Sequence, residues 1–216
     1  RDFARKVSHN HTKTTWVLKC DIRKFFASID HVVLKWVLGR HILDKDVLWL
    51  LNQVVESFES RNGSSKGLPL GNLTSQLLVN VYMNEFDQFV KRTLKTKYYI
   101  RYADDFLILH QNKQCLQELL LKIDEFLRAR LCLRLHPKKV SITTLASGID
   151  FLGWVHFSHH RVLRTVTKRR MFKRLELNPS CESLASYLGL LGHGDAYGLA
   201  NAIKVIVGPD SKPVQD

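Results

Sequence analysis

The chain has 216 residues, of which 45% are hydrophobic, so it is long and apolar enough to bury a sizeable globular core. It carries 33 Lys and Arg residues against 20 Asp and Glu residues, and the formal charge of +13 favours a polyanionic partner such as nucleic acid. No apolar run approaches the roughly 20 residues of a membrane span, and residues 1–6 lack the apolar core of a secretory signal, so we expect a cytoplasmic protein without a membrane partner.

The first half of the sequence predicts one strand followed by three helices. Residues 14–20 form a short apolar run that predicts a buried strand, with Asp21 at its carboxyl end. Residues 61–67 are a polar turn, and the third helix ends near Lys95. The expected helix caps are Asp30, Asp44 and Asn72. Apolar residues follow the caps at helical spacing: Val33, Trp36 and Val37, then Val47, Leu50, Leu51, Val54, Val55 and Phe58, then Leu73, Leu77, Leu78, Val81, Tyr82, Phe86 and Phe89.

The second half predicts a hairpin, a helix and a further strand. Residues 98–109 are apolar, β-branched and aromatic on both sides of residues 103–105, which is the pattern of a hairpin that turns on an acidic pair. Residues 116–127 have the apolar spacing of an amphipathic helix, and residues 133–135 follow as a short strand. This order of elements indicates an α+β layered fold.

The four cysteines indicate neither a zinc ribbon nor a disulfide framework. They are widely spaced and form no Cys-x-x-Cys pair, so reduced thiols fit best. The four are Cys20, Cys115, Cys132 and Cys181.

Three carboxylates are the strongest candidates for chemistry. Asp21 ends the first strand, and Asp104 and Asp105 lie at the tip of the predicted hairpin. Adjacent acids at the ends of apolar strands repel each other unless a cation lies between them, and a hard cation such as Mg²⁺ prefers oxygen ligands. An isolated Asp-Asp pair is more often a solvated turn, so the surrounding residues decide the interpretation.

Two of these segments resemble the motifs of reverse transcriptases. The stretch Tyr102-Ala-Asp-Asp105 resembles their tyrosine-x-aspartate-aspartate box, and Lys19-Cys-Asp-Ile-Arg-Lys-Phe-Phe-Ala-Ser-Ile-Asp30 resembles their first aspartate motif. Both occur in the order that the family has. The resemblance extends over residues 16–155 and more weakly beyond. It implies RNA-templated DNA synthesis by two-metal nucleotidyl transfer.

The resemblance also implies a division of the chain. The fold would be a polymerase palm, an antiparallel sheet packed on helices, followed by a small helical thumb. We expect residues 1–15 to be a remnant of the fingers, residues 16–160 the palm with part of the fingers, residues 161–207 the thumb and residues 208–216 a disordered tail. Because the first residue is Arg1 and not Met, we expect the chain to be part of a longer protein.

The resemblance implies roles for five residues around the metal ions. The resemblance implies that Asp21 and Asp104 ligate two Mg²⁺ ions, or Mn²⁺ in their place, while Asp105 assists and the Ile22 carbonyl completes one coordination shell. Lys139 would lie near the leaving pyrophosphate, where an ammonium can donate a proton or neutralise charge. A solvated basic loop is the alternative for Lys139.

A second group of residues would contact the incoming nucleotide. Phe26, five residues after Asp21, matches the bulky side chain that excludes a 2′-hydroxyl in the family, and core packing is an equally strong interpretation. The predicted nucleotide-binding residues are Lys24, Phe25, Phe26, Leu70, Gly71 and Gln76.

A third group would contact primer and template. The basic run from Arg161 to Arg174 would follow phosphates of the duplex, although a solvated helix face is the usual reason for such a run. Residues 151–154, Phe-Leu-Gly-Trp, resemble the turn that grips the primer end, and core packing explains this aromatic turn equally well. The predicted residues are Tyr102, Phe151, Leu152, Gly153, Arg164, Lys168, Arg169 and Arg170.

Residues 68–76 discriminate best between kinds of reverse transcriptase. Most members have a glutamine before the glycine of this motif and a Ser-Pro pair later, whereas this chain has Leu70 before Gly71 and then Ser75-Gln76. The departure resembles the enzymes of diversity-generating retroelements, which are encoded by bacteria or phages and copy a template RNA with errors at adenines. Loss of the amide removes a hydrogen-bonding group, so selection against mispairs would weaken.

Two other kinds of protein compete with this interpretation. One is a reverse transcriptase of a group II intron, a retron or a defence system, and the other is a non-catalytic palm that binds RNA. The intact Asp21, Asp104 and Asp105 argue against a pure binder, because three anions would repel its ligand. The implied partners are template RNA, a DNA or RNA primer, dNTPs and an accessory RNA-binding protein.

Overall fold

The computed structural model describes residues 2–8, 12–58, 63 and 65–207. The expected disordered tail 208–216 and part of the polar turn 61–67 lie outside the described residues. Within them the fold mixes helices with antiparallel sheet, as predicted. None of the helices in this part of the chain combines the length and the apolar character that crossing a membrane requires.

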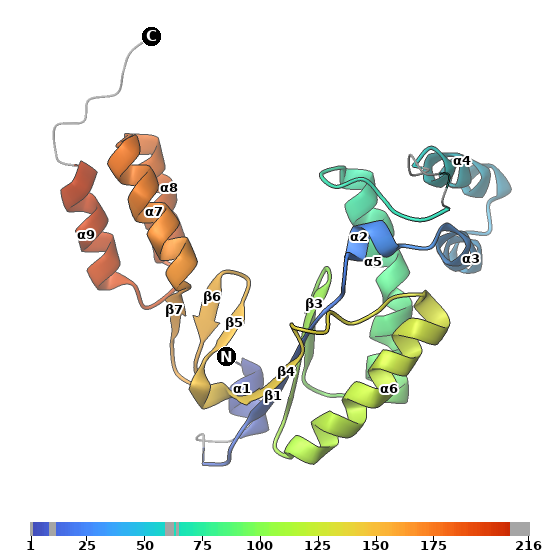
Figure 1. The fold of residues 1–216 in the computed structure, drawn as a ribbon, viewed down its shortest axis with the longest axis horizontal. Coiled ribbons are helices and arrows are strands. Elements are labelled where there is room, and N and C mark those ends of the chain that lie inside the picture. The colour runs from blue at the N-terminus through green and yellow to red at the C-terminus, as the bar shows by residue number, and fades with distance from the viewer. Residues whose placement is uncertain (1, 9–11, 59–62, 64, 208–216) are drawn as a thin grey trace, which may run out of the picture.

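The main sheet has four antiparallel strands in the order β2-β3-β1-β4 (Figure 1). The strands are β1 (Trp16–Asp21), β2 (Tyr99–Tyr102), β3 (Asp105–His110) and β4 (Ser141–Thr144). The predicted first strand and hairpin are confirmed. The strand expected at 133–135 is wrong, because only Leu135 pairs, with Ile22, before the chain turns where the Lys139 N–H donates to the His136 carbonyl.

The helices before the small sheet include the four predicted ones in the predicted order, with two short additions, α1 and α2. They are α1 (Asp2–Val7), α2 (Phe25–Ser28), α3 (His31–His41), α4 (Lys45–Glu56), α5 (Leu73–Gln88), which continues as a π-helical turn (Phe89–Thr93), and α6 (Lys113–Leu131). Asp30 and Asp44 cap α3 and α4 with their side chains, as predicted. Asn72 occupies the cap position of α5 but its side chain makes no capping hydrogen bond.

Each face of the main sheet has its own core. Leu18, Phe106 and Ile108 point toward α5 and α6, and the Phe86 ring of α5 lies 5.0 Å from the Phe106 ring. Val17 and Leu107 alternate with them and belong to a second cluster on the opposite face. This second cluster also contains residues of α1 and of the small sheet described next.

The expected apolar stripe of α5 is only half correct. Leu78, Tyr82 and Phe86 are buried in the core, whereas Leu73 and Leu77 are 81% and 64% exposed. The two rows lie on different sides of the helix, because residues four apart share a face and residues five apart do not. Similarly, Trp36, Val47 and Leu50 are exposed on α3 and α4.

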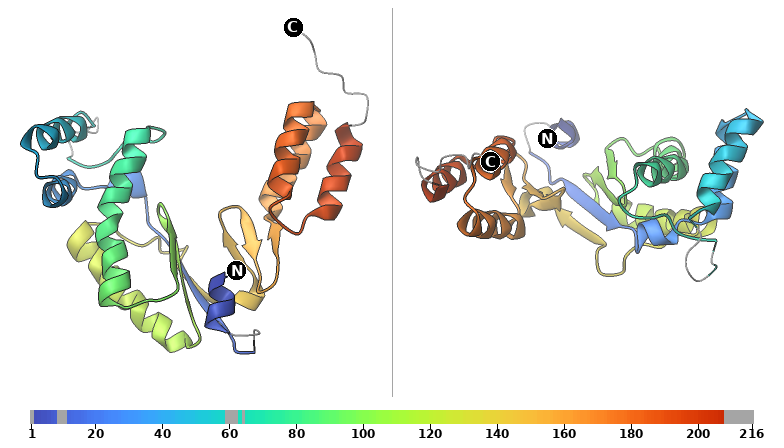
Figure 2. Two further views of the ribbon diagram at one scale, coloured as in Figure 1. Left: turned by 180° about the vertical axis from the view of Figure 1, so that it is seen from behind. Right: turned by 90° about the horizontal axis from the view of Figure 1, so that it is seen from above.

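A small antiparallel sheet carries the C-terminal helices. Its strands are β5 (Ile149–Phe151), β6 (Trp154–His156) and β7 (Arg161–Leu163), and the helices are α7 (Thr165–Leu177), α8 (Cys181–Leu191) and α9 (Tyr197–Val207). Three helices thus lie within the range 161–207 that was expected to be a helical thumb, while the domain boundaries stay a prediction. Helices α7 to α9 stand on one side of the molecule and α3 to α5 on the other, as Figures 1 and 2 show from opposite sides.

Trp154 joins the small sheet to the core of these helices. It packs in a cluster with Leu163, Met171 and Ile203, and it lies against Gly194. A Cβ atom at position 194 would come within 2.0 Å of the indole ring. The glycine is therefore required for close approach.

We predict that Gly194→Ala destabilises the protein by about 2 kcal/mol, because the methyl group overpacks a buried ring. The melting midpoint should fall by roughly 4–8 °C for a domain of this size. Gly189→Ala is the matched control, since a Cβ there meets no atom within 4 Å and helix α8 favours alanine. Equal midpoints for the two variants, measured by thermal unfolding, would show that Trp154 does not constrain residue 194.

Candidate active site

The three predicted carboxylates come together at one end of the main sheet. Asp21 ends β1 and pairs directly with Asp105, the first residue of β3. Asp104 lies in the turn between β2 and β3, and its carbonyl accepts a hydrogen bond of 3.2 Å from the Ile22 N–H. Ala103 begins this turn with a φ of 52°, a left-handed conformation that reverses the chain within two residues.

Strand alternation decides which face these side chains share. Residues 17, 19 and 21 of β1 point to one face of the sheet, and residues 105, 107 and 109 of β3 point to the same face. Because Val17 and Leu107 belong to the cluster away from α5 and α6, Asp21 and Asp105 lie on the face that the small sheet borders. The site therefore forms between the palm-like sheet and the small sheet.

Lys139 is the cation closest to the acidic group. Its ammonium donates to the Asp21 Oδ2 over 2.8 Å, and the same segment is tied to β1 by the His136 N–H, which donates to the Asp21 carbonyl over 2.8 Å. Asp21 itself is only 7% exposed. The Lys139 ammonium therefore contacts Asp21, while its role near the leaving pyrophosphate stays a prediction.

Burial and mutual repulsion perturb the titration of the group. Desolvation is the main reason why the pKa values of Asp104 and Asp105 are raised, and the charge of Asp21 raises both further. The hydrogen bond to Asp21 and the charges of the three carboxylates raise the pKa of Lys139. Lys139 therefore stays protonated at neutral pH, while the carboxylates lack full compensation of their charge.

The chemistry of the donors fits a hard divalent cation. Carboxylate and carbonyl oxygens are the ligands that Mg²⁺ and Mn²⁺ prefer, and desolvated carboxylates gain most from a neutralising charge. In the part of the chain that the structure describes, no three His, Cys, Asp or Glu side chains already form a metal-binding cluster. Instead the Lys139 ammonium contacts Asp21, so ion binding requires the side chains to rearrange. The ligand roles of Asp21, Ile22, Asp104 and Asp105 stay predictions.

A cavity of about 570 Å³ opens beside these carboxylates. Asp21, Asp105 and Lys139 line it together with Asp150 and Arg164 from the edge of the small sheet. The complete lining is Lys19, Asp21, Asp105, Lys138, Lys139, Ser141, Thr143, Gly148, Ile149, Asp150 and Arg164.

Two residues of this cavity were not found from the sequence. The Lys19 ammonium donates to the Asp150 carbonyl, and the Asp150 carboxylate forms an ion pair with Arg164. Lys19 could have been found, because it lies two residues before Asp21 on the same face of a strand. Asp150 is 131 residues from Lys19 in sequence, and no local pattern marks it as a site residue. Arg164, predicted to contact phosphates, is instead bound to a carboxylate at the cavity wall.

The predicted nucleotide-binding residues differ in their burial. Lys24 is exposed beside β1 with a φ of 47°, and the Phe25 ring is buried in the core, so a nucleotide contact at position 25 would come from its backbone. Phe26 is partly buried against the same core, which agrees with its packing interpretation. Leu70, Gly71 and Gln76 are exposed at the start of α5 and do not line the carboxylate cavity.

The predicted primer and template residues lie on the two sheets and on α7. Tyr102 is 63% exposed on β2, and the Phe151 ring is buried in the second cluster. Leu152 and Gly153 form the turn between β5 and β6, with φ values of 52° and 82°. Exposed basic side chains on α7 follow: Lys168, Arg169 and Arg170.

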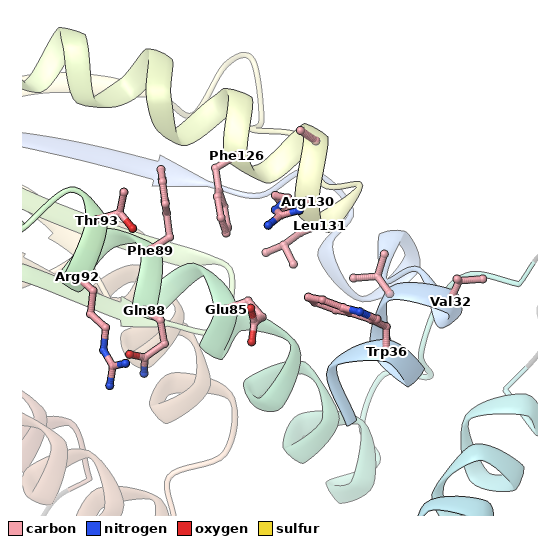
Figure 3. Close-up of a pocket in the computed structure, with 12 residues that line it drawn as sticks. Val32, Trp36, Glu85, Gln88, Phe89, Arg92, Thr93, Phe126, Arg130 and Leu131 are labelled. Atoms are coloured by element: carbon pink, nitrogen blue, oxygen red, sulfur yellow. The ribbon is translucent and has the colours of Figure 1, made fainter. Parts of the chain in front are cut away.

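A further cavity of about 460 Å³ lies between α3, α5 and α6 (Figure 3). Its wall includes the stacked rings of Phe89 and Phe126, whose centroids are 4.0 Å apart, and the exposed Trp36. None of the predicted site residues lines it. It is therefore separate from the carboxylate site.

Comparison with known proteins decides the family. The sequence pattern described as "Reverse transcriptase (RNA-dependent DNA polymerase)" matches residues 2–156. This chain belongs to the reverse transcriptase family. The match includes the three carboxylates and Lys139 but ends before β7 and the C-terminal helices.

The curated relatives of this reverse transcriptase chain are longer proteins. Protein YkfC of Escherichia coli strain K12 is 28% identical over 189 residues, which cover 71% of this chain and 48% of YkfC. The group II intron-encoded protein LtrA of Lactococcus lactis subsp. cremoris is 28% identical over 138 residues, which cover 60% of this chain and 23% of LtrA. This chain thus spans about half, or less, of these relatives.

Solved telomerases share the fold of this reverse transcriptase chain. The apo telomerase of Candida tropicalis has a TM-score of 0.60 at 13% identity and matches 95% of this chain and 43% of its own. The telomerase of Candida albicans in complex with a TWJ fragment of telomeric RNA has a TM-score of 0.56 at 12% identity, matching 95% and 42%. At these identities the likeness shows the fold alone.

We predict that Asp104→Asn and Asp105→Asn each raise the stability of the metal-free protein. A folded-state pKa above the ordinary value means that ionisation destabilises the fold, and this cost is fully present at neutral pH. Solvent screens the half-exposed carboxyls, so we expect well under ~1 kcal/mol and a rise in melting midpoint of about 1–2 °C. Chelator-treated protein at pH 7 gives the measurement.

Asp46→Asn provides the control for this prediction. Asp46 is exposed in the first turn of α4, where a negative charge interacts favourably with the helix dipole. Its replacement should leave the midpoint unchanged or slightly lower. If Asp104→Asn and Asp105→Asn both melted below the parent protein, the ionised carboxylates would stabilise the fold, contrary to their raised pKa values.

Proposed function

We propose that this chain is the catalytic core of an RNA-directed DNA polymerase, which extends a primer on template RNA by two-metal nucleotidyl transfer. The observation that carries the proposal is the direct pairing of Asp21 with Asp105 beside the Asp104 turn, in a chain of the reverse transcriptase family. The Candida albicans telomerase that shares this fold was solved with a TWJ fragment of telomeric RNA, so a protein of this fold can bind RNA. The whole protein's primer and dNTP substrates are part of the proposal.

The three carboxylates would together hold the two metal ions that the reaction uses. Bound at Asp21, Asp104 and Asp105, two divalent ions would supply a lower pKa for the primer 3′-hydroxyl and charge neutralisation at the triphosphate. Lys139 would then lose its contact with Asp21 and donate to the phosphate oxygens. Its raised pKa keeps the ammonium charged for this role.

The small sheet and α7 would position the duplex. The exposed turn at Leu152 and Gly153 borders the same face of the main sheet as the carboxylates, which supports contact with the primer end. The exposed Lys168, Arg169 and Arg170 would contact phosphates of the duplex, and this binding would weaken as salt rises. Arg164 would act differently, holding Asp150 and thus the edge of the cavity.

Primer extension by the full-length protein tests the proposal. With an RNA template, a DNA primer, dNTPs and Mg²⁺, we expect incorporation by the parent protein and a loss of at least about a thousandfold in Asp104→Asn. The exposed Asp46→Asn serves as a charge-matched control that retains activity. Unchanged extension by Asp104→Asn, or extension with chelator present, would reject the two-metal assignment.

A finer proposal concerns the kind of reverse transcriptase. We propose that the enzyme copies template RNA with frequent errors, as in a bacterial or phage diversity-generating retroelement, with an accessory RNA-binding protein as partner. Leu70 supports this, because it replaces the glutamine of most members and is 78% exposed next to the open turn at Gly71. An exposed leucine is available to the template or nucleotide and has no packing role to explain it. A group II intron enzyme is the alternative, which LtrA favours.

Error frequency distinguishes these alternatives. We predict that Leu70→Gln lowers misincorporation opposite template adenines several-fold, because the amide restores a hydrogen-bonding group at the nucleotide site. Leu73→Gln is the matched control, since Leu73 is equally exposed one residue beyond the cap of α5. Sequencing of cDNA made by each variant measures the errors. Identical adenine error rates in the parent and Leu70→Gln would favour the intron type.

A further inference from the structure

A second cavity near the carboxylates is lined by five cations and no acid among its nine residues. It has a volume of about 540 Å³ and lies between the segment after β1 and the segment after α6. Its lining is Arg23, Lys24, Ala27, Ser28, Lys66, Arg128, Cys132, Leu133 and Arg134. We propose that this basic cavity is a phosphate-binding site that receives the pyrophosphate released by the proposed polymerase reaction.

The charges of the basic cavity are only partly compensated. The Lys66 ammonium lies 3.5 Å from the Asp30 Oδ2, and the Arg128 guanidinium lies 2.8 Å from the Asp124 Oδ2. Arg23, Lys24 and Arg134 form no ion pair with any carboxylate that the structure describes. Cations that share a cavity repel each other, and a multiply charged anion between them removes this repulsion.

A backbone hydrogen bond holds the two segments of the basic cavity together. The Arg23 N–H donates to the Arg134 carbonyl over 2.9 Å. Cys132 has a φ of 51° and ends α6 as its left-handed cap, so the chain turns there toward Leu133 and Arg134. The cations of the cavity are therefore carried by segments that the fold brings together.

The basic cavity begins where the carboxylate site ends. Arg23 follows Asp21 by two residues, and Arg134 precedes by two residues His136, whose N–H donates to the Asp21 carbonyl. In nucleotidyl transfer the 3′-oxygen forms a bond to the α-phosphorus while the bond to the bridging oxygen breaks, and pyrophosphate leaves with that electron pair. Three carboxylates repel this anion, whereas Arg23, Lys24 and Arg134 attract it.

The chemistry that the cavity recognises is the phosphate group, and a single-stranded nucleic acid offers the same group. A small cavity with several convergent cations suits a compact di- or triphosphate, whose charges are close together. A phosphodiester strand has one charge per nucleotide and would use a longer groove. We therefore commit to pyrophosphate, and the strand is an outcome that the experiment can reveal.

The alkylation rate of Cys132 can report whether the basic cavity is occupied. Its side chain is exposed in the basic cavity, and Cys181 is exposed on α8, far from it in sequence. In the full-length protein without divalent ions, pyrophosphate at about four times its Kd should slow alkylation of Cys132 by N-ethylmaleimide about fivefold, because about four-fifths of the sites are then occupied. The rate at Cys181 should not change. Peptide mass spectrometry reads both rates, with sodium chloride matching the ionic strength.

A pair of charge-reversal variants makes the test specific. Arg134→Glu should raise the pyrophosphate concentration needed for half-maximal protection of Cys132 about tenfold or more, because it replaces a charge-assisted donor with a charge of the same sign as the ligand. Arg130→Glu makes the same change of net charge near the end of α6, but Arg130 lines the separate cavity of Figure 3, so protection should persist. Equal losses in both variants would mean only a general charge effect and would overturn the proposal.

Two further outcomes would overturn it. Pyrophosphate might fail to protect Cys132 at all, or a single-stranded RNA oligonucleotide might protect it while pyrophosphate does not, which would assign the cavity to a strand. The proposal rests on the polymerase function, but the experiments can reject the pyrophosphate site and the polymerase function independently of each other. The alkylation assay contains no metal, primer or template, so it reports on the cavity even if primer extension is never observed.

Discussion

The antiparallel pairing of β1 with β3 is the interaction on which the site depends. It places Asp21 opposite Asp105 and brings the Asp104 turn against Ile22. A slip of one residue would turn one of the two strands over and send its carboxylate to the opposite face of the sheet. The buried Phe106 and the other apolar residues of β1 and β3 prevent this slip, because it would expose them. The hydrophobic core therefore maintains the chemistry.

The same arrangement stores unfavourable electrostatic energy at the end of the sheet. Burial raises the pKa values of Asp104 and Asp105, so their charged forms are less stable here than in water. Lys139 compensates Asp21 directly and the turn residues only at a distance. A fold selected only for stability would not gather three acids here. This electrostatic cost has an explanation if metal ions and a polyphosphate bind at the site.

Local patterns in the sequence were sufficient for the elements but not for all of their surroundings. The short apolar run in residues 14–20 predicted β1, and the acids at 30 and 44 predicted two helix caps, because each signal lies within a few residues. Residues 133–135 have the composition of a strand, yet a single bridge to Ile22 and an immediate turn prevent a ladder. The ion pair of Asp150 with Arg164 joins β5 to the start of α7 through tertiary packing. No local pattern in the sequence could reveal that contact.

The distribution of the excess positive charge follows from the same geometry. A protein that binds a polyanion must not let its own carboxylates repel the ligand, so cations have to surround the acidic group without neutralising it completely. Lys19, Lys139 and Arg164 line the cavity that includes Asp21. Arg23 and Arg134 line the basic cavity, and both belong to segments that hydrogen bonds tie to β1 or its continuation. The strand that ends in Asp21 thus also helps to place the positive charges around this carboxylate.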